Sequence, residues 1–110
     1  MGAVRFEVAM GPSCQYHFKI FAQDGVLAVT SKGFQHKDSC MEAIRAVKEN
    51  AGFAERYIRK AAEGKSEFIL KAPNHTVVVQ GGPYEKDELC AQAMAAVKAS
   101  NQAAVIDKTA

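Results

Sequence analysis

Two cysteines stand at equivalent places in a sequence that repeats itself, and their thiols are the first groups that could do chemistry. Cys40 and Cys90 each fall near the first turn of a predicted helix, where the helix dipole lowers a thiol pKa and favours the reactive thiolate. Both also share a helical register with apolar residues, and free cysteine in that setting packs as a small hydrophobe. We therefore interpret both as core residues. Cys14 follows a Gly-Pro-Ser turn, and we expect it to be exposed and without a catalytic role.

A metal or anion site would need more ligands than the sequence offers. His36 and Cys40 are four residues apart and could face one metal ion, but a metal site takes three or four ligands and no others are near. Residues 81–83, Gly-Gly-Pro, precede a predicted helix and could present N–H groups to an anion. They lack the spacing of the dinucleotide-binding and P-loop motifs, so we interpret them as a turn. We expect no metal and no cofactor.

One basic segment has the composition of a nucleic-acid surface. A basic strand with an aromatic residue on an open sheet face can bind single-stranded nucleic acid. Acidic residues interrupt this segment, however, and no RRM-type aromatic motif is present. Nucleic-acid binding is therefore the alternative hypothesis, and it would rest on Arg56, Tyr57, Arg59, Lys60 and Lys65.

Composition excludes several classes of protein. The chain has 110 residues and a formal net charge of +2, which suits one domain without a nucleic-acid arm or acidic tail. No apolar run is long enough to span a bilayer, and residues 1–10 do not form a secretory signal. Three cysteines without metal spacing fit free thiols in a reducing compartment. We expect a cytoplasmic protein with no membrane contact.

The elements that would position these residues occur twice, fifty residues apart. A duplicated unit this short does not bury its apolar face alone, so two copies should close one core. We expect a single domain over residues 1–110, with repeats at about 4–52 and 53–108. The identical pairs are Phe18/Phe68, Ala22/Ala72, Val29/Val79, Cys40/Cys90, Ala43/Ala93, Ala46/Ala96, Val47/Val97 and Lys48/Lys98.

Hydrophobic periodicity predicts three strands and a helix in each copy, followed by a last strand. Alternation with period two indicates strands, and apolar residues at i, i+3, i+4 and i+7 indicate helices. Hairpin-linked strands followed by a helix predict an α+β fold with helices on one face of an antiparallel sheet. The predicted strands are 4–10, 16–20, 26–31, 56–61, 66–72, 76–80 and 104–108, and the predicted helices are 36–50 and 86–100.

Residues 24–34, DGVLAVTSKGF, and 43–50, AIRAVKEN, resemble the signature of the YegP-like family of small bacterial proteins. Residues 70–75 and 96–98 repeat parts of it in the second copy, and residues 55–57 and 105–108 are similar to the tandem members. The resemblance implies two β-β-β-α-β units that share one sheet, with pseudo-twofold symmetry and exchanged C-terminal strands. It also implies a monomer, since the tandem chain is in effect a covalent dimer.

The chain departs from the family pattern at the helix starts, among other places, and the resemblance carries no activity. The family usually has serine before each helix, where this chain has His36 and Lys86. Loss of a side-chain N-cap costs about 1 kcal/mol. We expect a non-enzymatic module that binds another protein through a sheet edge or an exposed sheet face. Nucleic-acid binding is the alternative, and a thiol-based enzyme is a third, weaker hypothesis.

Overall fold

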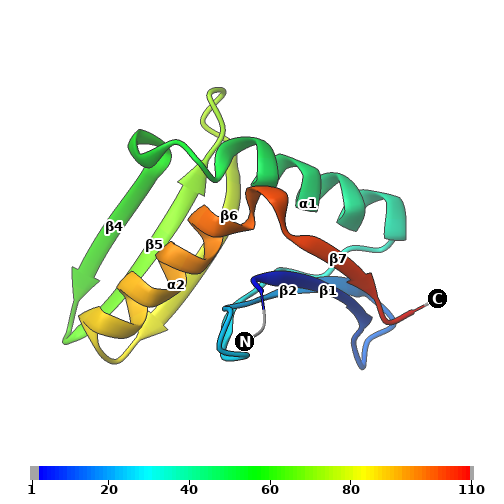
Figure 1. Cartoon of the computed structure of the whole chain (residues 1–110), viewed down its shortest axis with the longest axis horizontal. Coiled ribbons are helices and arrows are strands. Elements are labelled where there is room, and N and C mark those ends of the chain that lie inside the picture. Colours follow the sequence, from blue (N-terminus) through cyan, green and yellow to red (C-terminus); the bar gives the residue numbers. More distant parts are fainter. Residues whose placement is uncertain (1–2, 110) are drawn as a thin grey trace.

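The computed structural model describes residues 3–109 and has an α+β fold. Within this range, seven strands and two α-helices follow the predicted order, which confirms the fold class and the duplication (Figure 1). Two short 3-10 helices, η1 and η2, follow the two α-helices. The elements are β1 Arg5–Met10, β2 Tyr16–Phe21, β3 Leu27–Thr30, α1 Lys37–Asn50, η1 Ala54–Arg56, β4 Tyr57–Ala62, β5 Lys65–Lys71, β6 Val77–Tyr84, α2 Asp87–Ala99, η2 Ser100–Gln102 and β7 Ala104–Asp107.

The strands form two sheets, whereas the resemblance implied one shared sheet. Sheet A has the order β3-β2-β1-β7, and sheet B has the order β4-β5-β6. Strands β3 and β6 contact each other without forming a ladder. The outward carbonyl of Ala28 in β3 instead accepts a hydrogen bond from the hydroxyl of Tyr84 in β6. The Tyr84 side chain therefore hydrogen bonds a backbone carbonyl that, in a continuous sheet, would be paired with the neighbouring strand.

A single apolar core lies between the sheets and the helices. Each helix contacts strands of both sheets. The apolar residues that repeat at helical spacing are buried, except Ala43 and Met94, which are partly buried. Burial of a phenylalanine or leucine side chain contributes roughly 1.5–3 kcal/mol, so both copies depend on the shared core. Its largest fully buried side chains are Phe6, Phe18, Phe68, Ile20, Leu70, Val8, Val47 and Val97.

The C-terminal strand crosses to the other half of the molecule, which confirms the predicted exchange. Helix α2 contacts β5 and β6 of sheet B, yet β7 pairs in parallel with β1 of sheet A. Likewise, the chain leaves α1 through η1 and enters β4 of sheet B. In sheet A, the first strand of copy one (β1) and the strand after α2 (β7) are two separate strands. In sheet B, β4 is both the strand after α1 and the first strand of copy two, so this sheet has three strands among the described residues.

Strand β6 is longer than predicted, and the interpretation of residues 81–83 as a strand-ending turn is wrong. The strand continues to Tyr84, with Gly81 opposite Phe68 and Tyr84 opposite Ser66. A register shift between Ser66 and Phe68 accommodates the irregular stretch, as a β-bulge does. Gly81 lies where a Cβ atom would meet the ring of Phe68, so a residue without a side chain allows the close approach.

The helix starts follow the expectation for their caps. His36 and Lys86 are the N-cap residues of α1 and α2, and neither side chain makes a capping hydrogen bond. Acidic residues in the first turns, Asp38 in α1 and Asp87 in α2, suit the helix dipole.

Candidate interaction site

The thiols of the two helices are buried in the core, as predicted. Cys40 and Cys90 have no exposed surface, and burial raises the pKa of both thiols. A raised pKa keeps them protonated at neutral pH, and the thiolate is the reactive form. Cys14 is exposed, as predicted. Neither helix cysteine therefore lies where a substrate could reach it.

The proposed histidine–cysteine pair does not converge. His36 is exposed at the start of α1, whereas Cys40 points into the core. In residues 3–109 no group of three or more His, Cys, Asp or Glu side chains could hold a metal ion.

The residues of the basic segment, 56–65, make contacts with different parts of the molecule. Nη1 of Arg56 donates to Oδ1 of Asn50 at 2.6 Å, and its guanidinium group lies 4.0 Å from the centre of the Phe53 ring. The hydroxyl of Tyr57 donates to the carbonyl oxygen of Ala51 at 2.7 Å, and burial raises the pKa of Tyr57 to about 12. Both residues thus hold the connection between α1 and β4.

The remaining basic residues lie on different sides of sheet B. Nη2 of Arg59 donates to the carbonyl oxygen of Asp87 at the start of α2, at 3.0 Å. Lys60 is the next residue in β4 and points to the opposite face, and Lys65 begins β5 beside the turn. The structure does not gather the five residues of the nucleic-acid hypothesis on one face.

An apolar groove with a volume of about 640 Å³ lies between β3 and α2. One wall is the β2–β3 hairpin and the other is α2. Val26, Leu27 and Leu89 are large apolar residues at its rim, with exposed fractions of 59%, 45% and 44%. The groove is lined by Val4, Ala22, Gln23, Asp24, Val26, Leu27, Ala28, Tyr84, Leu89, Gln92, Ala93, Ala95, Ala96 and Ala99.

Tyr84 and Ala28 join the two sheets beneath this groove. The Tyr84 hydroxyl donates to the Ala28 carbonyl oxygen at 2.6 Å. Burial raises the pKa of Tyr84 to about 12, so the hydroxyl keeps its proton and remains a donor at neutral pH. Residues from both sheets, joined by this hydrogen bond, therefore form the floor of the groove.

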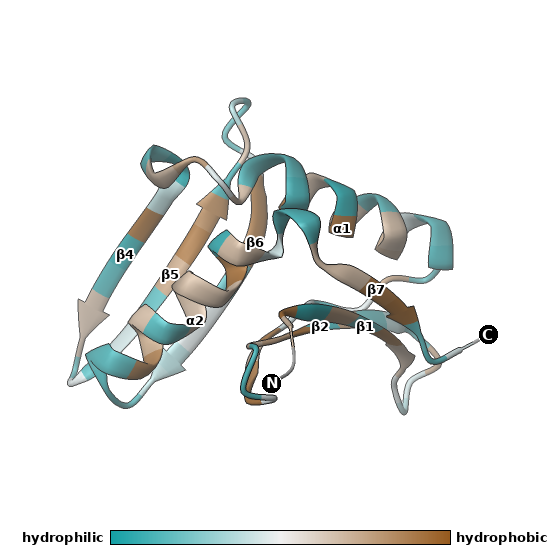
Figure 2. Cartoon of the chain, viewed as in Figure 1, coloured by the Kyte–Doolittle hydropathy of each residue, from teal (hydrophilic) through white to brown (hydrophobic). Residues whose placement is uncertain are grey.

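The other copy has a different surface at the equivalent places. At four positions that line the groove, α2 has an uncharged residue, and three of the four are apolar, whereas α1 has polar or charged residues there. Figure 2 shows α1 as the more hydrophilic of the two helices. This signal lies in the positions at which the two copies differ, whereas the duplication is recognised from the positions at which they agree. The pairs are Leu89 for Ser39, Gln92 for Glu42, Ala95 for Arg45 and Ala99 for Glu49.

A family model matches the chain twice, over residues 13–57 and 61–107, and is described as a domain of unknown function, DUF1508. The chain belongs to the DUF1508 family. The two matches agree with the duplication seen in the fold. The description assigns no activity to DUF1508.

Bacterial UPF0339 proteins, YegP among them, are similar in sequence to this DUF1508 chain. This similarity confirms the YegP-like resemblance. UPF0339 protein YegP of Escherichia coli K12 is 32% identical over 96 residues, covering 86% of this chain and 87% of the relative. The UPF0339 protein in the ptx operon 5' region of Stutzerimonas stutzeri is 34% identical over 83 residues, covering 74% of this chain and 75% of the relative.

Solved structures share the DUF1508 fold. The solution structure of yegP from E. coli has a TM-score of 0.83 and 31% identity, covering 98% of this chain and 95% of that chain. A UPF0339 protein from Shewanella oneidensis has a TM-score of 0.83 and 24% identity, covering 94% of this chain and 90% of that chain.

Neither helix of the described part of this DUF1508 chain is long and apolar enough to cross a membrane.

Proposed function

We propose that the protein is a non-enzymatic interaction module that binds another protein through the groove between β3 and α2. The observation that carries the proposal is the exposed apolar wall of α2, whose counterpart on α1 is polar. Two copies of one unit share a fold, so a difference confined to their surfaces is not needed for folding.

Apolar side chains of a partner are the ligands that suit this groove. Contiguous exposed apolar surface on a small protein marks interaction sites, and Val26, Leu27 and Leu89 supply it here. Full burial of one such side chain contributes roughly 1.5–3 kcal/mol. The alanines of α2 allow close approach, because their short side chains leave the groove open.

We also propose that the protein works as a cytoplasmic monomer. Three free cysteines fit a reducing compartment. The exchanged strand and the shared core are supplied within one chain, so no second copy is needed to complete the fold.

The experiment uses a photo-crosslinking amino acid placed at Gln92 in the native host. The matched control is the same amino acid at Glu42, the equivalent position on α1. We expect a defined protein adduct from position 92 that is absent from position 42 and survives nuclease. Equal labelling from both positions, or an adduct that nuclease removes, would contradict the proposal.

A substitution taken from the other copy tests the same surface. Ala95→Arg gives α2 the residue that α1 has at Arg45, and arginine has nearly the helix propensity of alanine. We expect the adduct from position 92 to disappear while the melting curve stays within a few degrees. An unchanged adduct would exclude the groove as the binding surface.

A further inference from the structure

The outer edge of β4 is the counterpart of an edge that is already occupied in sheet A. Val8 of β1 lies opposite Phe18, and Arg59 of β4 lies opposite the equivalent Phe68. Strand β1 also carries β7 on its other side, in parallel, with Asp107 opposite Val8. Within residues 3–109, no strand pairs with the corresponding side of β4.

The backbone of β4 presents hydrogen-bonding groups along this edge. The carbonyl of Val8 points away from β2, since it accepts a hydrogen bond from the Lys108 amide at 2.8 Å. Arg59 has the same position relative to β5, so its carbonyl also points outward, and alternation along an antiparallel strand places the Ala61 amide on the same side. An added strand would find these groups in the arrangement that β1 offers to β7.

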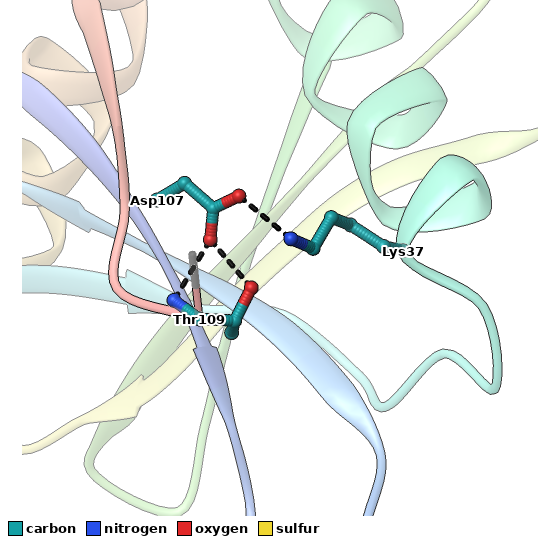
Figure 3. Close-up of polar contacts among 3 residues, drawn as sticks. All are labelled: Lys37, Asp107 and Thr109. Carbon is teal, nitrogen blue, oxygen red and sulfur yellow. Dashed lines mark hydrogen bonds and ion pairs between the residues drawn. The ribbon is translucent and has the colours of Figure 1, made fainter.

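An open hollow of about 520 Å³ lies beside this edge, between β4 and the start of α2. It is lined by Arg59, Lys60, Ala61, Asp87, Glu88 and Ala91. In copy one the corresponding place, between β1 and the start of α1, holds the end of β7. Figure 3 shows Asp107 of that strand bound to Lys37, the first residue of α1, with Nζ and Oδ2 2.8 Å apart.

The charge of Arg59 decides what this edge can bind. An arginine on the core-facing side of an edge strand opposes pairing with apolar strands, because such a strand would remove water from a charge whose ion pair with Asp87 is long, at 3.6 Å. Pairing of β4 with β4 of a second copy would bring Arg59 and Lys60 of both chains together, and like charges across strands are unfavourable. A carboxylate on the incoming strand would pair with Arg59 and so offset the cost of covering its charge.

We infer that the edge of β4 binds an extended segment of a partner protein, in parallel, with an aspartate or glutamate opposite Arg59. The position is the one that Asp107 takes opposite Val8. The Arg59 side chain has an exposed fraction of 42%, and Nη2 of its guanidinium group lies 3.6 Å from Oδ1 of Asp87. The guanidinium group has five N–H donors. It therefore has donors left for a second acceptor. This surface is separate from the proposed groove.

The test uses a peptide with the sequence of residues 103–109, AAVIDKT, since this is the strand that fills the equivalent place. NMR titration of the labelled protein to millimolar peptide should shift and protect the Arg59 and Ala61 amides. The same peptide with lysine in place of aspartate should bind at least tenfold more weakly. Arg59→Leu should abolish that difference between the two peptides.

Controls separate this inference from the groove. Ala95→Arg should leave peptide binding unchanged, so failure at either surface does not decide the other. No binding at millimolar peptide, equal binding of the lysine peptide, or shifts located outside β4 would each overturn the inference. Protection of the same amides by concentrated protein alone would overturn it in favour of a second copy.

Discussion

The hydroxyl of Tyr84 in β6 lies 2.6 Å from the carbonyl oxygen of Ala28 in β3 and donates a hydrogen bond to it. These residues are in different copies of the repeat and in different sheets. Copy one has Phe34 at the position of Tyr84, so this bond has no symmetric counterpart. It fixes the spacing of the two sheets where the apolar groove begins.

Tyr84→Phe should therefore lower the free energy of unfolding by about 1 kcal/mol, since a net hydrogen bond contributes about that much. The ring itself remains, so the core should keep its packing against Phe68, whose ring centre lies 6.3 Å away. Urea denaturation of the variant and the native protein measures the difference. A change below a few tenths of a kcal/mol would mean that the bond does not hold the sheets together.

The C-terminal strand should loosen in acid. The hydrogen bond from Lys37 and those from Thr109 lower the pKa of Asp107 from 3.8 to about 2. A carboxyl whose pKa is lower in the folded state stabilises that state above the unfolded pKa, and the contribution is lost as pH falls through the folded pKa. Protection of the Lys108 amide, which donates to Val8, should fall between about pH 4 and pH 2.

Asp107→Asn provides the control for this pH dependence. Asparagine keeps the shape of the side chain but carries no charge, so the protection of Lys108 should be lower at neutral pH and should lack the acid step. An identical pH profile in both proteins would assign the step to another group.

Gly81→Ala should destabilise the protein by about 1–3 kcal/mol, the usual cost of overpacking. A Cβ atom there would meet the ring of Phe68 and would lie 2.8 Å from the hydroxyl oxygen of Tyr84. Gly52→Ala is the matched control, because its Cβ would meet no atom within 4 Å. Equal midpoints of urea denaturation for the two variants would contradict the close packing of β6 on β5.

The three thiols should differ in their rates of alkylation. Cys14 is exposed and should react at once in the folded protein, whereas Cys40 and Cys90 should react only after unfolding, because both are buried and burial raises their pKa. Mass spectrometry after brief maleimide treatment counts the labelled thiols. Rapid labelling of either helix cysteine at neutral pH would revive the hypothesis of thiol chemistry.

Local patterns in the sequence were sufficient for the helices and for most strand limits. The stripe of Cys40, Ile44 and Val47 predicts the buried face of α1, and the alternation of Phe6 and Val8 with charged residues predicts β1. These patterns suffice because side-chain direction repeats every 3.6 residues in a helix and every two in a strand. The prediction of a turn at residues 81–83 was wrong, because a bulge depends on the partner strand.

The candidate sites could be predicted less well from the sequence than the helices and strands. The basic residues around Tyr57 are close in sequence, but Arg56 binds Asn50 and Arg59 reaches the start of α2. Proximity along the chain does not say which face a side chain takes once the strand is paired. The apolar wall of α2 was overlooked because alanines such as Ala95 and Ala99 resemble ordinary helix-forming residues until a neighbouring strand makes them one side of a groove.

The sequence by itself determined the duplication, the class of fold, the buried stripes of the two helices and the membership of the family. Only the tertiary structure decided that the strands divide into two sheets, that β4 keeps an open edge within residues 3–109, and that Tyr84 joins β6 to Ala28. The physical reason is the range of the interactions. Periodicity records which side of an element is apolar, whereas the choice of neighbouring strand depends on how two nearly identical halves fill one shared core.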